Sequence, residues 1–508
     1  MTQLDFRKTF FEEIVKVQLG YVPSIMIAPA HLANGFFRAI GGGYYNNPAQ
    51  HWAVYAKTDP LRGPNPPRTK RQFENFTEQQ QAALRALSAN GNARRAISEA
   101  FAADSTLFGP VNQSSYSLSH ARHTTNDNHD RETGQWLCDI LQNGDLHLAY
   151  DLLHKLLTQV AIHTNPEESV MSDVLSLMSL PFIDESQEPK QKDLPHWPPM
   201  SLKVIDSGQF QDDIVNVIRA AFDQLAANDE RSALKNGKLD TLRRMTTLGC
   251  FSVYLHLINI GGVEQRVPML LNLNKNSRTL KRASQASYQA IVPSIESFFH
   301  TAITQKLDQL MAEGVFGELN DEPSIRSFIE DTINWYRNRP NVREDSKVAG
   351  FKHDCWNFYE SYRGETAGYE PIKALSYALT DMIGLVFSAK PYDVARNLGV
   401  KIGLLTRGDR KGSKAYELHP DLLEVLVRAT LPVGQEWTIK ELAQAWFDDF
   451  GLLFGGLGNE NEILADWGAP PIDHSELATN VRQLEQQLEL SGYAQRYADG
   501  VVLIRVEH

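Results

Sequence analysis

Long amphipathic stretches constrain the fold of this chain most, because apolar residues recur in them at the spacing of an α-helix. The segment "QFQDDIVNVIRAAFDQLAA" (209–227) carries one such stripe, formed by Phe210, Ile214, Ile218, Phe222 and Leu225. The same spacing predicts further helices at 1–17, 145–161, 291–311, 323–336 and 370–387. The sequence therefore predicts a mainly α fold.

Two segments in the middle of the chain have the composition of strands. "FSVYLHLINI" (251–260) and "RVPMLLNL" (266–273) are rich in aliphatic and aromatic residues, and a glycine pair at 261–262 separates them. Short apolar runs bounded by glycine are typical of buried strands. We therefore expect these two segments to form a small central sheet within the helical fold.

A chain of 508 residues is too long for one ordinary hydrophobic core, so we expect several domains. The polar, proline-rich run at 183–203 is the best candidate for a linker. It would join an N-terminal helical domain (1–182) to a central helical domain (204–400), which holds the small sheet and a basic surface. Residues 401–508 would form a third, acidic domain.

The acidic domain has the order of elements expected of a winged helix. Helices are predicted at 419–431, 438–451 and 474–493, and a hairpin that turns at Asp499–Gly500 follows them. Thr438, with Glu441 three residues later, has the signature of a capping box at the start of the second helix.

Winged helices often bind DNA through their third helix. Here that helix carries Glu476, Glu485 and Glu489 against the single cation Arg482, and phosphates would be repelled by this balance. We therefore expect the acidic domain to dock a protein partner.

Charge is distributed unevenly along the chain. Residues 415–508 contain 16 acidic and 5 basic side chains, whereas 231–290 contain ten basic and two acidic ones. Segment 396–414 adds six bases against one acid. This division indicates two kinds of partner, a polyanion for the basic segments and a protein for the acidic domain.

The segment "LNKNSRTLKRASQASYQAI" (273–291) contains the strongest basic cluster. Ser277 is expected to cap a helix on which Arg278, Lys281 and Arg282 share one face. Cations in a first turn oppose the helix dipole, and a bound anion would explain their presence there. The predicted nucleic-acid-binding residues are Arg243, Arg244, Lys275, Arg278, Lys281, Arg282, Arg407, Arg410, Lys411 and Lys414. In the alternative interpretation, these charges form a solvated face or pair with the acidic domain.

The stretch "SHARHTTNDNHDRE" (119–132) is rich in side chains that can bind divalent metals. The candidate ligands are His120, His123, Asp127, His129, Asp130 and Glu132. They suggest, as an alternative function, a metal-dependent nuclease or phosphohydrolase. The residues at 126–128 are Asn, Asp and Asn, however, and they favour a polar loop over a metal-binding helix.

Several other classes are disfavoured by what the sequence lacks. "GDRKGSK" (408–414) does not have the spacing of a phosphate-binding loop, and we expect no cofactor. The three cysteines, Cys138, Cys250 and Cys355, lie far apart, which favours a reducing cytoplasm over a disulfide framework or zinc site. The most apolar run, 374–389, is short and contains Asp381, so no membrane span is expected.

"NLGVKIGLL" (397–405), the basic stretch after it and the predicted acidic winged helix, which begins with "HPDLLEVLVRA" (419–429), resemble the C-terminal parts of poorly characterised accessory proteins encoded in bacterial anti-phage defence gene clusters. The resemblance covers about a fifth of the chain and contains no diagnostic motif. It implies a non-catalytic subunit that works beside a helicase, nuclease or motor. We therefore expect a cytoplasmic, non-enzymatic adaptor of a bacterial multiprotein complex. Its basic central surface would bind nucleic acid, with DNA favoured, and its acidic domain would dock another protein subunit.

Overall fold

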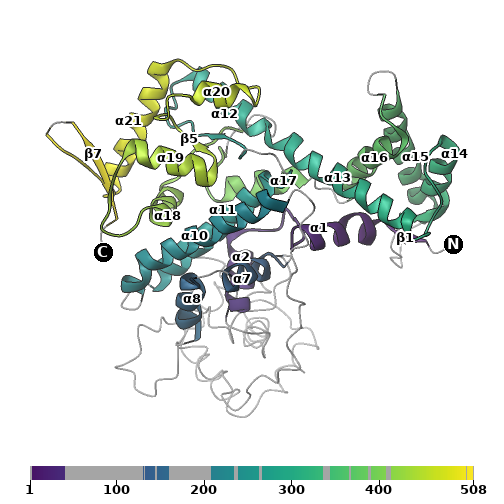
Figure 1. The fold of residues 1–508 in the computed structure, drawn as a ribbon, viewed down its shortest axis with the longest axis horizontal. Helices are drawn as coiled ribbons and strands as arrows, with labels where there is room; N and C mark the ends of the chain where they lie inside the picture. The colour runs from purple at the N-terminus through teal and green to yellow at the C-terminus, as the bar shows by residue number, and fades with distance from the viewer. Residues whose placement is uncertain are drawn as a thin grey trace, which may run out of the picture.

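The computed structural model describes residues 3–40, 130, 132–143, 146–158, 208–233, 238–261, 266–335, 344–364, 368–386, 391–407, 414–498 and 500–506. These residues form a mainly helical fold with three small sheets, as Figure 1 shows. The predicted α class is thereby confirmed.

Two long helices, α10 (Gly208–Ala233) and α11 (Lys238–Ile258), pack against each other at the centre of the molecule. The predicted stripe on α10 is buried from Ile214 to Leu225. Below these helices in Figure 1 lie α2 (Pro29–Ile40), α7 (Thr133–Gln142) and α8 (Leu148–Thr158). Above them lies α18 (Pro420–Thr430), so the central pair is covered on two sides.

Residues 251–258 belong to α11, so the prediction of a strand at 251–260 is wrong. Every residue of this stretch is buried, because α2, α10, α13, α17 and α18 surround the helix. A helix that is buried all round shows no amphipathic stripe, and its composition then resembles that of a buried strand.

The second predicted strand is present but short, as β2 (Met269–Leu270). Its partner is the distant strand β5 (Leu452–Leu453), to which it pairs in parallel. Isolated bridges add Tyr416 beside Leu271 and beside Leu405. The central and C-terminal parts of the chain are thus joined by backbone hydrogen bonds.

Helices α12 (Arg278–Gln289) and α13 (Ile291–Ala312) lead from β2 toward a peripheral group of elements at the right of Figure 1. This group comprises α14 (Glu322–Ser327), the π-helical turn η7 (Phe328–Thr332), β3 (Ile333–Asn334), α15 (Glu344–Arg363) and α16 (Pro371–Val386). The N-terminal strand β1 (Leu4–Asp5) pairs in parallel with β3. The turn η1 (Lys8–Glu12) and α1 (Glu13–Gln18) follow it.

The C-terminal part begins after α17 (Pro391–Lys401) and α18. It continues with β4 (Glu436–Thr438), α19 (Ile439–Phe450), β5, α20 (Glu460–Ala465), α21 (His474–Leu490), β6 (Ala494–Arg496) and β7 (Val502–Arg505). Strands β4, β7 and β6 form an antiparallel sheet in that spatial order. The capping box predicted at the start of α19 is present, since the Thr438 and Glu441 side chains each bond to the other's backbone N–H.

One cluster of buried apolar residues extends from Phe6 to Val506 and crosses the predicted boundary at residues 400 and 401. The domain limits stay a prediction, and the proposed linker at 183–203 lies outside the described residues. None of the described helices is both long enough and apolar enough to cross a membrane.

Candidate nucleic-acid interface

Helix α12 presents a basic face because its other face is buried. The Ser277 hydroxyl caps the helix by accepting a hydrogen bond of 3.0 Å from the Leu280 backbone N–H. Leu280, Ala283, Ser284, Ser287 and Tyr288 are buried on the inner face. Arg278 and Arg282 are exposed and Lys281 is half-buried, as the helical spacing predicts.

The first turn of α12 receives an anion from the chain itself. The Ser277 hydroxyl donates a 2.8 Å hydrogen bond to Glu476 of α21, and the Thr279 hydroxyl donates another to the same carboxylate. A carboxylate at this position offsets the unfavourable interaction of the nearby cations with the helix dipole. Glu476 therefore stabilises the first turn of α12. This is part of the role that we expected from the sequence for a bound external anion.

A pocket of about 750 Å³ opens beside α12 and brings together basic residues that are far apart in the sequence. Its described lining comprises Asn272, Leu273, Lys275, Lys281, Thr406, Arg407, Glu417, Leu418, His419, Pro420 and Gln487. Three of the predicted nucleic-acid-binding residues are thus found at one site. Lys275 and Arg407 are exposed, and neither forms an ion pair within the described part of the chain.

Asn272, which the sequence did not single out, lies in the wall of this pocket. Its side chain is buried, and its Oδ1 atom has no hydrogen-bond partner among the described residues. The backbone holds it in place, because the Asn272 N–H donates to the Tyr416 carbonyl oxygen at 2.9 Å. No sequence pattern marks this residue, since its position depends on pairing between segments 140 or more residues apart.

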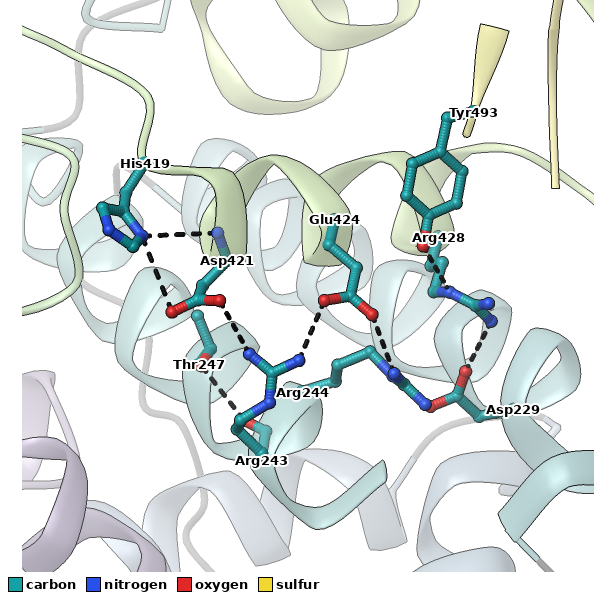
Figure 2. Close-up of polar contacts among 9 residues, drawn as sticks. All are labelled: Asp229, Arg243, Arg244, Thr247, His419, Asp421, Glu424, Arg428 and Tyr493. Atoms are coloured by element: carbon teal, nitrogen blue, oxygen red, sulfur yellow. Dashed lines mark hydrogen bonds and ion pairs between the residues drawn. The ribbon is translucent and has the colours of Figure 1, made fainter. Parts of the chain in front are cut away.

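Arg243 and Arg244 have a different environment, shown in Figure 2. The Arg243 guanidinium donates to Asp421 and to Glu424 of α18, in each case at 2.9 Å. Arg244 donates to the other Glu424 oxygen at 2.8 Å and to Asp229 of α10 at 2.6 Å. Both arginines therefore link α11 to α18 through ion pairs, and Arg244 also links it to α10. The pairs with α18 agree with the alternative interpretation, in which these charges pair with the acidic domain.

Asp229 has no exposed surface and also accepts a hydrogen bond from Arg428 at 2.8 Å. Burial by itself raises the pKa of the Glu424 carboxyl, but Arg244 and Arg243 lower it below its usual range. Burial also opposes the charge of Arg244, yet Asp229 and Glu424 raise the pKa of Arg244 above its usual value. Glu424 and Arg244 thus stabilise each other's charged form within this ionic network.

The basic loop after α17 contributes Thr406 and Arg407 to the lining of the pocket. Lys414 is buried, and its ammonium group donates to the carbonyl oxygens of Thr406 and Arg407 at 2.6 and 2.9 Å. It therefore holds the backbone beside Arg407 in place. Arg410 and Lys411 lie outside the described residues.

Most of the candidate metal site, namely His120, His123, Asp127 and His129, lies outside the described residues. Asp130 is buried and accepts a hydrogen bond from the Gly134 N–H at 3.2 Å, in the first turn of α7. Its carboxylate occupies the space that a Cβ on Gly35 of α2 would need.

Glu132 pairs with Lys16 at 3.0 Å. Among the described residues there is no group of three or more His, Cys, Asp or Glu that could hold a metal ion. Cys138, Cys250 and Cys355 are buried free thiols, and burial raises their pKa values.

No protein-family model matches the chain, and a search of curated proteins found no match either.

Proposed function

We propose that the protein is a non-enzymatic, nucleic-acid-associated adaptor subunit of a bacterial multiprotein complex, with DNA as the favoured nucleic acid. The principal support is the pocket beside α12, where Lys275, Lys281 and Arg407 converge from two segments. Arg278 and Arg282 extend this positive surface along the exposed face of α12. Lys and Arg side chains arranged in this way suit the phosphate backbone.

The proposed surface is smaller than the charge of the sequence suggests, because several cations are used internally. Arg243 and Arg244 pair with carboxylates of α10 and α18, and Lys414 donates to backbone carbonyl groups. Arg266 pairs with Asp213 at 2.7 Å. We therefore assign nucleic-acid binding to Lys275, Arg278, Lys281, Arg282 and Arg407.

We further propose that α18, α19, α21 and the sheet β4–β7–β6 form a winged helix that docks a protein partner. The order of the three helices and the antiparallel hairpin that follows α21 support this assignment. The carboxylates of α21 disfavour DNA as its ligand: Glu476 bonds to Ser277 and Thr279, and Glu485 and Glu489 pair with Arg496.

The place of this adaptor in the cell is also a proposal. The resemblance of the C-terminal fifth of the chain to accessory proteins of anti-phage defence clusters suggests a role in such a system. Three buried free thiols suit the reducing conditions of the cytoplasm.

The salt dependence of DNA binding tests the proposed surface. Replacing Arg278 and Arg282 together by Ala should weaken binding to unrelated DNA sequences and lower the slope of log affinity against log salt by about two, because each lost phosphate contact retains its counterions. Binding is measured by fluorescence anisotropy at several salt concentrations. The matched control, Lys155→Ala with Lys440→Ala, removes two exposed cations from α8 and α19 and should leave the slope unchanged.

An unchanged slope in the Arg278 and Arg282 variant, with parent affinity retained, would contradict the proposal. Equal loss of affinity in both double variants would show that only the net charge of the protein matters.

A further inference from the structure

Among the described residues that line the pocket beside α12, cationic side chains outnumber carboxylates. Three cationic side chains line it, and Glu417 is the one carboxylate among the described lining residues. A phosphodiester within a strand carries a single negative charge. A terminal phosphate carries a charge of about −1.5 to −2 at neutral pH, so it balances the surplus of the pocket better.

The Asn272 side chain indicates that the ligand of this pocket contains a hydrogen-bond donor in addition to an anionic group. Its Oδ1 atom is buried without a hydrogen-bond partner among the described residues, and buried polar atoms are rarely left in this state. An amide oxygen accepts hydrogen bonds and donates none. A phosphate dianion offers only acceptor oxygens and cannot satisfy it, whereas a sugar hydroxyl or the amino group of a base can.

The remaining lining provides room and apolar contact for a sugar or a base. Leu273, Leu418 and Pro420 contribute apolar wall, and Gln487 contributes a second amide. A volume of about 750 Å³ is within the range of small-molecule sites. Cations, an unpaired acceptor and apolar wall together match a phosphorylated nucleoside.

We infer that this pocket binds one nucleotide that carries a phosphomonoester, presented either as a free nucleotide or as the phosphorylated end of a nucleic-acid strand. Lys275, Lys281 and Arg407 would bind the phosphate, and the buried Asn272 amide would rotate toward the pocket to accept a hydrogen bond from the sugar or base. The inference rests on the proposed function, because the pocket is part of the same basic surface.

The test compares oligonucleotides of one sequence that carry a 5′-phosphate, a 3′-phosphate or hydroxyls at both ends, using the full chain and an internal fluorescent label. One phosphorylated end should bind about tenfold more tightly than the hydroxyl end, because the phosphate gains charge-assisted hydrogen bonds. Arg407→Ala, alone and with Lys281→Ala, should abolish this preference. Arg278→Ala with Arg282→Ala should weaken all three oligonucleotides and keep the preference, since neither residue lines the pocket.

A second measurement separates a nucleotide from a bare anion. A nucleoside monophosphate should bind the parent protein more tightly than inorganic phosphate in calorimetry. Asn272→Leu should remove this difference while it preserves or raises the melting temperature, because an apolar side chain of similar size replaces a polar atom that lacks a partner. A lower melting temperature with unchanged nucleotide affinity would make Asn272 a structural residue and overturn its assignment.

The outcomes distinguish this inference from the proposed function. Equal affinity for all three oligonucleotides, with salt-sensitive binding that depends on Arg278 and Arg282, overturns the inference and leaves the proposed function in place. A nucleoside monophosphate that binds through Arg407 to a protein without affinity for any oligonucleotide overturns the proposed function and supports a site for free nucleotides. Inorganic phosphate that binds as tightly as the nucleotide overturns the inference.

Discussion

At the scale of single residues, Asp229 is the member of the ionic network that is most sensitive to change. It has no exposed surface and accepts hydrogen bonds from Arg244 and Arg428, on two different helices. Removing one partner of a buried ion pair is strongly destabilising, because the remaining charge stays away from water. The two neighbouring arginines of α11 differ in this respect, since Arg243 binds no fully buried carboxylate among the described residues.

We therefore predict different effects for the two arginines. Arg244→Ala should lower the free energy of unfolding by roughly 3–5 kcal/mol, because it leaves Asp229 with one cation fewer. Arg243→Ala should cost roughly 1–2 kcal/mol, since Asp421 is largely exposed and Glu424 keeps Arg244. Urea unfolding measures both values. If a variant keeps the parent stability and its DNA-binding salt slope falls by about one, the arginine that it lacks contacts nucleic acid instead.

At the scale of elements, His256 of α11 joins three parts of the chain. Its Nδ1 atom forms a 3.1 Å hydrogen bond with the hydroxyl of Tyr21, which precedes α2, and its ring centroid lies 4.8 Å from that of Trp136 on α7. Burial lowers the pKa of His256 to about 4 from its usual value of 6.5. The imidazole is consequently neutral in the folded protein at neutral pH.

This environment predicts a loss of stability in mild acid. The unfolded chain takes up a proton at His256 as the pH falls through 6.5, whereas the folded chain resists protonation until about pH 4. The free energy of unfolding should therefore fall across this window. His256→Gln keeps a polar side chain beside Tyr21 but binds no proton, so its stability should fall less between pH 7 and 5.

Urea unfolding at pH 7 and at pH 5 gives the loss of unfolding free energy for the parent and for the variant. His300, which stacks on Tyr377 and whose pKa is also lowered to about 4, contributes equally to both proteins and cancels. An identical loss of stability in parent and variant would show that His256 is protonated in the folded state.

Local sequence patterns predicted the elements whose ends and faces depend on neighbouring residues. They did not predict features that depend on contacts between distant segments. The ends of α19 follow from Thr438, Glu441 and Gly451, because caps act within one turn of the helix. The basic face of α12 follows equally from local spacing. The pocket could not be predicted from local spacing. Arg407 and Lys281 line the same pocket only because the backbone of Tyr416 pairs with Leu271 and with Leu405. For the same reason, the charges of Arg243 and Arg244 are visible in the sequence but their carboxylate partners are not.

At the scale of the whole molecule, one cluster of buried apolar residues includes both Trp136 of α7 and Trp446 of α19. Elements that share a core generally unfold together. We therefore predict one cooperative unfolding transition for the regions around these two residues. Tryptophan fluorescence and far-ultraviolet circular dichroism, recorded on the same protein in urea, should therefore give coincident midpoints. Two separate midpoints would show that the C-terminal part is an independent folding unit.

The parallel pairing of β2 with β5 has a consequence for synthesis on the ribosome. Met269 and Leu270 emerge long before Leu452 and Leu453, and at about 5–20 residues per second this interval lasts roughly ten seconds or more. During that time β2 lacks its pairing partner, and its unpaired edge can associate with other nascent chains. Contacts between such distant segments also slow the final step of folding. Production of the protein should therefore depend on chaperones that bind exposed strands until translation has passed residue 453.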